Sequence, residues 1–437
     1  MRDVFFKLIV CMCLSISTIF FGGCDNFGDN SEENDGGITL PTISHKPIDK
    51  MPEKIEVDVF FDATYSMQGY TTLAAGNVYR TLPDILDSIG TSMGKANFFR
   101  FGENVQPIEG RQYRNFSSST PYTEVITAVH NVIDYAKPDH LSVIITDLFE
   151  SEADWSNISK KISTKFFAEH KVAAVIGIKN SFNGDIFDVG LNAAKFNYNS
   201  ADNPAKYRPF YLLILGDEAP VKDFMDRFKE VQNLPNETGY LLLSEHLTDT
   251  TSDLSKMEIG EMENFFPEEK LNITEKGVKE FGLDKFTSPA MFTVNFEYKA
   301  PLGACPLDMS VMTQEVRILT LNDGNWTERA DNDVKIEATP IDGQENNFMV
   351  KLSLTPEKSL NEGQINFVSA SFVPTAKGYQ LPQWVKNWSM ANVDVAPENF
   401  DGSKTVNLIH VLGALKDSVF ATAHPALMDF NFAVDAR

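Results

Sequence analysis

Short, nearly continuous apolar runs alternate with helix-like segments between residues 53 and 234. Such runs are typical of strands that are buried on both faces, as in a parallel sheet covered by helices. The alternation of strands and helices predicts an α/β fold with a doubly wound, mostly parallel sheet. The predicted strands are VDVFFDAT, ANFFRFG, LSVIITDLF, VAAVIGI and RPFYLLILG, and the predicted helices span Val78–Ser92, Glu124–Tyr135, Asp154–His170 and Pro220–Gln232.

Residues 235–437 have a different pattern, in which apolar and polar residues partly alternate between clusters of Asn, Asp, Gly and Pro. Several strands of this kind predict an antiparallel β-sandwich, so we expect a β-rich, sandwich-like C-terminal domain. Trp384 and Trp388 lie one helical turn apart on a short predicted helix, and we expect them to pack against this sandwich. The predicted strands are AMFTVNFEYKA, VRILTLND, DVKIEATPI, FMVKLSLT and INFVSASFV.

The N-terminus resembles an export signal. An apolar run from Leu8 to Phe21 follows basic residues, and it is short for a membrane span but suits the core of a signal peptide. Small residues then precede Cys24, and this pattern resembles a bacterial lipobox. The resemblance implies that residues 1–23 are a lipoprotein signal peptide and that Cys24 is acylated. An ordinary cleaved signal and a retained transmembrane anchor are the alternatives.

Residues 24–52 are polar and acidic, without a hydrophobic period, which predicts a flexible tether. The expected location is therefore the cell envelope, where acylated Cys24 anchors the chain to a lipid membrane. The outer membrane or the cell surface of a bacterium suits this arrangement best.

Acidic residues outnumber basic residues by 61 to 38, which gives a formal net charge of −23 at pH 7. A protein that binds the phosphates of a nucleic acid needs a positively charged surface, so we expect no nucleic-acid partner. Cys11 and Cys13 lie within the predicted signal peptide, and Cys305 is the single cysteine that follows Cys24. A disulfide framework is therefore excluded, and burial of apolar side chains must stabilise the fold.

Candidate chemistry begins where the first predicted strand ends. Asp62, Thr64 and Ser66 occupy alternate positions there and offer a carboxylate and two hydroxyl groups. Hard cations such as Mg²⁺ prefer oxygen ligands, and the carboxyl ends of strands form the ligand crevice of open α/β sheets. These residues resemble the D-x-S-x-S element of the metal-ion-dependent adhesion site of von Willebrand factor A domains, with Thr64 in place of the first serine.

The same family completes its site with a threonine on a neighbouring loop and an aspartate after the next strand. Thr123, in TEVITA, and Asp147, in IITD, match those two elements in the expected order. The resemblance implies that Mg²⁺ or Mn²⁺ is held by Asp62, Thr64, Ser66, Thr123 and Asp147. Leu148 departs from the family pattern, because many members have glycine after the T-D pair.

A long connection between VAAVIGI and RPFYLLILG, residues 179–207, reads as a hairpin rather than a helix. It leaves the carboxyl end of a strand, so we expect it to begin on the side of the metal site.

The resemblance implies metal-bridged recognition, in which an acidic side chain of a protein partner replaces a water on the ion. Adhesion or complex assembly would be the function, with no catalysis. The alternatives are a metal-dependent hydrolase that uses Asp62 or Asp147 as a base, and a structural envelope lipoprotein whose A-type scaffold holds no metal. The sequence contains no Walker A, G-x-G-x-x-G or H-E-x-x-H motif, which leaves the enzyme alternative without a catalytic signature.

Overall fold

A computed structural model describes residues 38–41, 50–74, 77–148, 152–189, 194–232, 234, 237–250, 253–268, 271, 278–344, 346–375, 377–391 and 400–437. The predicted signal peptide 1–23, the proposed lipidation site Cys24 and most of the tether 24–52 lie outside these residues. Within the described residues, no helix has the length and apolar character needed to cross a membrane.

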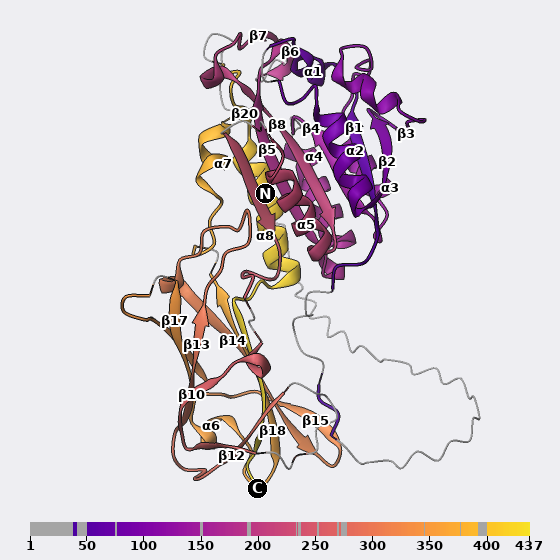
Figure 1. Ribbon diagram of the computed structural model, residues 1–437. Helices are drawn as coiled ribbons and strands as arrows, with labels where there is room; N and C mark the ends of the chain where they lie inside the picture. The colour runs from indigo at the N-terminus through magenta and orange to yellow at the C-terminus, as the bar shows by residue number, and fades with distance from the viewer. Residues whose placement is uncertain are drawn as a thin grey trace, which may run out of the picture. The chain divides into compact units, whose positions relative to one another are not determined.

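The first sheet has seven strands in the described part of the chain, in the order β3-β2-β1-β4-β8-β5-β9 (Figure 1). Strand β1 pairs in parallel with β2 and β4, whereas the other neighbours in the sheet are antiparallel. The α/β class is confirmed, but the prediction of a mostly parallel sheet is wrong. The strands are β1 (Ile55–Asp62), β2 (Gly94–Phe101), β3 (Val105–Pro107), β4 (Leu141–Thr146), β5 (Val172–Asn180), β8 (Arg208–Gly216) and β9 (Thr238–Leu243).

The connection between β5 and β8 explains the antiparallel pairings. A parallel neighbour requires a crossover, usually a helix, that carries the chain back to the starting edge of the sheet. Here the connection is a hairpin of β6 (Asn183–Val189) and β7 (Ala194–Asn199), as the sequence predicts. The chain therefore returns in the opposite direction, and β8 lies between β4 and β5.

Helices cover both faces of this sheet, because its strands bury side chains on both sides. One core joins the sheet to α2 (Leu82–Met93) and α5 (Glu218–Lys229), and the other joins it to α3 (Val129–Tyr135) and α4 (Glu152–Lys165). On β1, Val59 and Phe61 belong to the first core and Phe60 belongs to the second. Successive strand residues point to opposite faces, so a continuous apolar run supplies both cores.

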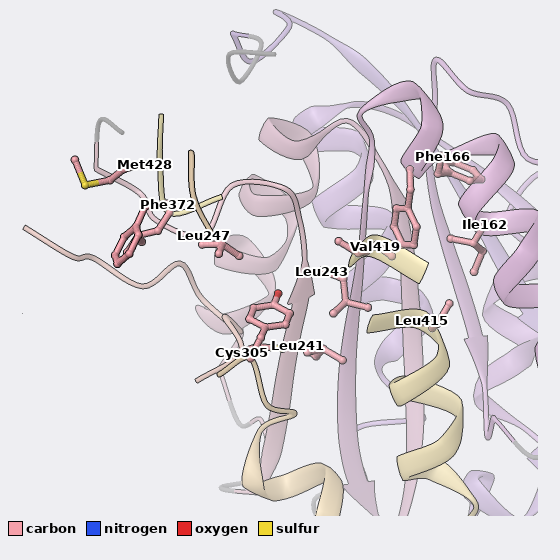
Figure 2. Packing of buried hydrophobic residues seen from close by; sticks show 14 of the residues in the cluster. Ile162, Phe166, Leu241, Leu243, Leu247, Cys305, Phe372, Leu415, Val419 and Met428 are labelled. Atoms are coloured by element: carbon pink, nitrogen blue, oxygen red, sulfur yellow. The ribbon is translucent and has the colours of Figure 1, made fainter. Parts of the chain in front are cut away.

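Two segments from beyond residue 235 complete these layers. Helix α8 (Leu408–Ala423) packs against α4, where Ile162 and Phe166 lie in the same buried cluster as Leu415 and Val419 (Figure 2). Strand β9 forms an edge of the sheet by pairing with β5. The predicted domain ranges 53–234 and 235–437 stay predictions. Helix α8 and strand β9 belong to the second range but are packed against elements of the first.

The β-rich region contains two further sheets, in the orders β10-β13-β17-β16 and β11-β12-β21-β18-β14-β15. Rings of Phe281, Phe292 and Phe432 join them, with the centroid of Phe292 5.3 Å from that of Phe281 and 5.5 Å from that of Phe432. The predicted strand runs are confirmed. The strands are β10 (Ile259–Glu263), β11 (Phe265–Pro267), β12 (Lys279–Leu283), β13 (Ala290–Glu297), β14 (Met312–Asn322), β15 (Asn325–Arg329), β16 (Lys335–Pro340), β17 (Asn347–Leu354), β18 (Ile365–Pro374) and β21 (Met428–Asp435).

Trp384 and Trp388 pack elsewhere than expected. They lie on α7 (Gln383–Trp388), and the Trp384 indole Nε1 donates a hydrogen bond to the carbonyl of Tyr240 in β9 at 3.0 Å. Their rings cover Gly177 and Gly239, which face each other across β5 and β9. The tryptophan pair thus contacts the seven-stranded sheet.

The remaining short elements are α1 (Tyr65–Gln68), α6 (Pro356–Ser359), β19 (Ser389–Met390), β20 (Thr405–Val406), η1 (Gly69–Thr71), η2 (Gln112–Ser117), η3 (Phe167–Glu169), η4 (Pro204–Lys206), η5 (Leu254–Lys256) and η6 (Met309–Val311).

Candidate functional site

The carboxyl end of β1 is held against the loop that contains Thr123. The amide of Ala63 donates to the carbonyl of Phe101 at 2.8 Å, which extends the pairing with β2 beyond Asp62. The carbonyl of Ala63 accepts hydrogen bonds from the amides of Thr123 and Glu124, at 2.9 and 3.0 Å. Backbone contacts therefore bring the first two predicted site elements together.

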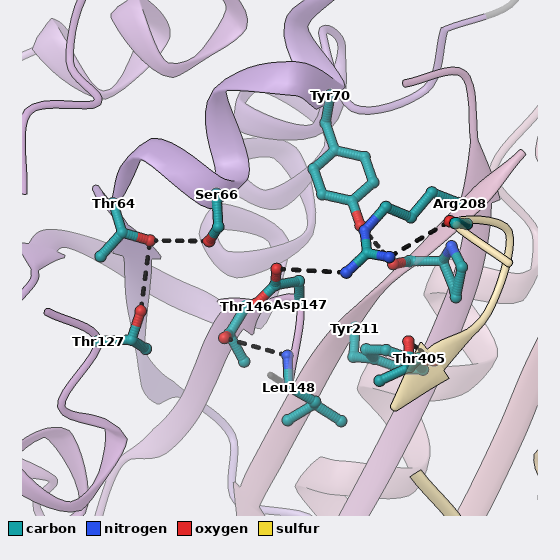
Figure 3. A network of polar contacts seen from close by, with 12 residues as sticks. Thr64, Ser66, Tyr70, Thr127, Thr146, Asp147, Leu148, Arg208, Tyr211 and Thr405 are labelled. Atoms are coloured by element: carbon teal, nitrogen blue, oxygen red, sulfur yellow. Dashed lines mark hydrogen bonds and ion pairs between the residues drawn. The ribbon is translucent and has the colours of Figure 1, made fainter. Parts of the chain in front are cut away.

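Three predicted ligands, Asp62, Thr64 and Ser66, form one oxygen cluster at this end, and Figure 3 shows the contact between Thr64 and Ser66. The Thr64 hydroxyl donates to Asp62 Oδ1 at 2.6 Å, and the Thr64 amide donates to the same oxygen at 3.0 Å. The Ser66 hydroxyl, in the first turn of α1, lies 3.1 Å from Thr64 Oγ1. Asp62 and Thr64 are buried and Ser66 is half-buried, so the cluster opens toward solvent at Ser66.

The neighbouring loop contributes Thr127 to this cluster. The Thr127 hydroxyl lies 3.3 Å from Asp62 Oδ2 and 3.3 Å from Thr64 Oγ1. The Thr123 side chain is exposed, and its hydroxyl oxygen accepts a hydrogen bond from Arg100 Nη2 at 3.0 Å. Arg100 Nη2 also pairs with Glu124 Oε1 at 2.9 Å. The sequence singled out Thr123, and the structure places Thr127 against the carboxylate.

Asp147, which directly follows β4, supplies a second carboxylate. The Thr146 hydroxyl donates to Asp62 Oδ2 at 3.2 Å and accepts from the Leu148 amide at 3.3 Å. Leu148 has φ 54°, a left-handed backbone that favours glycine. Burial of the leucine side chain in the core compensates for the strain of this conformation.

Asp147 has a buried arginine as its neighbour. Arg208 Nη2 lies 3.7 Å from Asp147 Oδ2, and only 1% of Arg208 is exposed. Its Nη1 donates to the carbonyls of Gly402 and Lys404, each at 3.2 Å. Arg208 was not predicted from the sequence, although a charged residue at the start of the fully buried run RPFYLLILG is the signal that could have identified it.

Burial and like charge perturb the Asp62 carboxylate. Burial of Asp62 raises its pKa to about 7, and the negative charge of Asp147 adds to this shift. Hydrogen bonds from Thr64 and Thr146 oppose the shift by favouring the ionised form. When both carboxylates are ionised, Arg208 leaves one negative charge in the buried cluster without a compensating cation.

The residues of the cluster fit a hard divalent cation. Asp62, Thr64 and Ser66 present one carboxylate and two hydroxyl oxygens within hydrogen-bonding distance of one another, and oxygen is the ligand atom that Mg²⁺ and Mn²⁺ prefer. The raised pKa of Asp62 also indicates a buried negative charge that a cation would stabilise. Arg208 reduces the need for a cation, because its guanidinium already compensates for the negative charge of Asp147.

A second group of metal-ligating residues lies at the other end of β1. His140 Nδ1 is 2.8 Å from Asp58 Oδ2, and His140 Nε2 is 3.9 Å from Glu56 Oε2. Asn97 Nδ2 donates to both carboxylates at 2.8 Å, and Lys95 pairs with Glu56 at 3.1 Å. These partners satisfy the carboxylates without an ion. This group was not predicted from the sequence, although the charged residue Asp58 within a largely apolar strand could have indicated it.

Large apolar side chains are exposed around the Asp62 cluster. Val125 is 83% exposed, and Tyr65 and Ile126 are also exposed. Because the amide of Tyr65 donates to the carbonyl of Glu124 at 3.1 Å, Tyr65 lies next to Val125 and Ile126. We call Tyr65, Val125 and Ile126 the apolar rim.

The β6–β7 hairpin extends this rim, as expected from its position after β5. A groove of about 520 Å³ separates the hairpin from α1, and its lining includes Tyr65, Gln68, Phe187 and Lys195. The surface next to Ser66 therefore combines an apolar rim with a polar groove.

No protein-family model matches this chain, and a search of curated proteins gave no match either.

Proposed function

We propose that this chain is a binding protein that recognises a protein partner at the carboxyl end of β1. The proposed module is a variant of the von Willebrand A domain in which β8 is inserted between β4 and β5. The observation that supports it best is the juxtaposition of the Asp62–Thr64–Ser66 oxygen cluster with the exposed apolar rim. Exposed apolar surface of this kind marks interaction sites on soluble domains.

Asp62, Thr64 and Ser66 would hold Mg²⁺ or Mn²⁺, with Thr127 orienting the Asp62 carboxylate. The bound ion supplies a Lewis-acidic position that a carboxylate of the partner can occupy. Charge favours such a partner, because a dication added to Asp62, Asp147 and Arg208 gives the site a net positive charge. The apolar rim would then bury side chains that flank the partner's acidic residue.

The N-terminal segment supports a location for this activity. Acylation of Cys24 would anchor the protein in the cell envelope, and the acidic tether 24–52 would give the binding site reach above the membrane. Adhesion or complex assembly at the envelope follows from these proposals. The β-rich region, which we propose to be a sandwich, would be a spacer or a second binding surface.

One observation favours a second candidate, a structural envelope protein that holds no metal. The Arg208 guanidinium pairs with Asp147 and so supplies part of the compensation that an ion would give. The hydrolase alternative gains no such support, because Asp62 and Asp147 are both buried and therefore out of reach of a substrate in this arrangement.

Calorimetric titration with Mg²⁺ and Mn²⁺ tests the metal site. Asp62→Asn keeps the shape of the side chain and should abolish binding. Asp58→Asn is the matched control, because it removes a carboxylate from the same strand at the other end, and it should leave the affinity unchanged. If Asp58→Asn abolished binding and Asp62→Asn did not, the ion would belong to the Glu56–Asp58–His140 group.

Cross-linking of the tagged protein in cells tests the partner. Chelation with EDTA and the Asp62→Asn substitution should both release the captured protein. A partner that stays bound under both conditions would support the metal-free structural role.

A further inference from the structure

A second cavity, outside the Asp62 cluster, lies between α4 and α8. It has a volume of about 640 Å³, within the range of small-molecule sites. The Ser163 and Thr422 hydroxyls lie 2.6 Å apart and join the two helices near their C-terminal ends. Ile162, Phe166, Leu415 and Val419 belong to the buried cluster between these helices (Figure 2). We call this cavity the α4–α8 groove.

Two buried donors line this groove without a partner. Trp155 is 3% exposed and Ser159 is 5% exposed, and both belong to α4. Among the described residues, neither the Trp155 indole Nε1 nor the Ser159 hydroxyl has a hydrogen-bond partner. Buried polar groups in folded proteins are almost always paired, and an unpaired donor carries the full cost of its desolvation. Two such donors in one groove therefore indicate that acceptor atoms belong there.

The charge of the groove defines the ligand further. Its lining, in the part of the chain that the structure describes, contains no Asp or Glu, although the chain has 61 of them. Lys160 and His410 are exposed at its edge. An indole N–H and an ammonium group can only donate hydrogen bonds, so the ligand must bring the acceptors. Carboxylate and phosphoryl oxygens are the strongest acceptors for such donors.

Hydroxyl groups form much of the remaining lining. Ser156 and Ser418 lie on opposite helices, and Asn407 adds an amide at the start of α8. Hydroxyls and amides both donate and accept, which suits a ligand with hydroxyl groups of its own.

We propose that the α4–α8 groove binds a small polyhydroxylated anion, a sugar acid or a sugar phosphate. Its carboxylate or phosphoryl oxygens accept hydrogen bonds from Trp155 and Ser159 and pair with Lys160. Its hydroxyls contact Ser156 and Ser418. Both donor atoms are covered in the free protein, so binding requires rotation of the Ser159 side chain and a small opening between the helices. This site is independent of the metal-bridged recognition proposed above.

Calorimetric titration of the full chain with glucuronate, glucose 6-phosphate and neutral glucose tests the proposal. At least one anionic probe should bind no less than about tenfold more tightly than glucose, because a hydrogen bond to a charged group is lost in the neutral sugar. The two anions also show whether the groove prefers a carboxylate or a phosphoryl group.

Two conservative variants locate the site. Trp155→Phe removes the indole N–H and should weaken binding about tenfold, and Ser159→Ala should weaken it several-fold. Ser159→Ala should not lower the midpoint of urea unfolding without probe, because it removes a hydroxyl that makes no hydrogen bond in the free protein. Trp155→Phe also shortens a buried ring and should lower that midpoint, so its probe affinity is measured on the fraction that is folded. Trp326→Phe is the matched control, since its indole already donates to the Thr39 carbonyl at 2.8 Å, and it should leave the probe affinity unchanged.

The proposal is overturned if no anionic probe binds, if glucose binds equally well, or if Trp155→Phe and Ser159→Ala both bind like the parent chain. Repeating the titration with Asp62→Asn separates the two sites. Probe binding should survive this substitution, so failure in the groove and failure at the metal site are distinguishable.

Discussion

Asp62, Asp147 and Arg208 place three ionisable side chains in a region that water hardly reaches. The positive charge of Arg208 compensates mainly for Asp147, because the arginine forms an ion pair with Asp147 Oδ2. Asp62 instead depends on hydroxyl and amide donors from Thr64, Thr146 and Thr127. Burial and the charge of Asp147 raise the pKa of Asp62, and neutral donors, which stabilise a carboxylate less than a cation does, do not offset that rise.

The raised pKa of Asp62 predicts a particular pH dependence in metal-free buffer. Its folded pKa of about 7 lies above the value in the unfolded chain, so the folded state retains a proton between about pH 4 and pH 7. Unfolding releases that proton, and the free energy of unfolding must therefore fall as the pH rises through this window. The loss should reach about 4 kcal/mol at pH 8.

Urea unfolding at pH 4 to 8, in the presence of a chelator, measures this effect. Asp62→Asn should remove the corresponding part of the slope and stabilise the chain at pH 8. Saturating Mg²⁺ should stabilise the parent at pH 8 but not the variant. Identical slopes for parent and variant would contradict the assignment.

The two threonines of the neighbouring loop give a second prediction. Thr127→Val should weaken Mg²⁺ or Mn²⁺ binding by about tenfold, because its hydroxyl orients the Asp62 carboxylate. Thr123→Val should have little effect, because that hydroxyl is bonded to Arg100. Calorimetry on the two variants compares them directly, and the reverse order of affinities would restore Thr123 to the ligand set.

The sequence predicted that Asp62, Thr64, Ser66 and Asp147 lie at neighbouring strand ends, because motif spacing and strand ends fix where such residues lie, and their role as ligands stays a prediction. It could not distinguish Thr123 from Thr127, since both belong to one loop whose hydrogen bonds depend on Arg100. Arg208 was not predicted, because it joins the site only through the position of β8 in the sheet, although its charge at the start of a buried run was visible in the sequence.

At the scale of elements, apolar runs predicted five of the seven described strands of the first sheet, all but β3 and β9, and did not predict their direction. A run such as RPFYLLILG is buried on both faces whether its neighbours are parallel or antiparallel. The direction of β8 follows from the β6–β7 connection, which contains no crossover helix. The hairpin was visible in the sequence, so this consequence could have been drawn from it.

The packing of α7 on the sheet predicts a local sensitivity. A Cβ atom at Gly239 would lie 2.5 Å from Trp384 Cδ2, within an indole that is fixed by its bond to Tyr240. Gly239→Ala should therefore lower the free energy of unfolding by about 1–3 kcal/mol. The control is Gly413→Ala in α8, where a Cβ meets no described atom within 4 Å.

Gly413→Ala should stabilise the chain by about 0.5–1 kcal/mol, because alanine has the higher helix propensity. Urea unfolding measures both variants. Equal destabilisation by the two substitutions would show that the contact with Trp384 is not the cause.

At the scale of the molecule, the first sheet depends on distant parts of the chain. Strand β9 pairs with β5. Helix α8 packs against α4 on one face of the sheet, with Leu412 and Leu415 fully buried. A chain that ends at residue 234 would expose both contacts. We therefore expect a fragment of residues 50–234 to bind apolar dyes and to unfold without cooperativity, whereas residues 50–437 should fold.

Dye fluorescence and thermal unfolding by circular dichroism compare the two fragments. A cooperative transition in the shorter one would establish an independent domain with the boundary that the sequence predicts. Adding residues 400–437 as a separate peptide should not rescue it, because β9 would still be missing.

Strand β21 lies between β12 and β18 in the middle of its sheet, and α8 immediately precedes it. These residues are synthesised after nearly all of the others described here, yet each fills an interior position in one of the two layered regions. A nascent chain that has not yet reached β21 therefore lacks the pieces that close either region. Its apolar surfaces remain available to chaperones until synthesis has passed this strand.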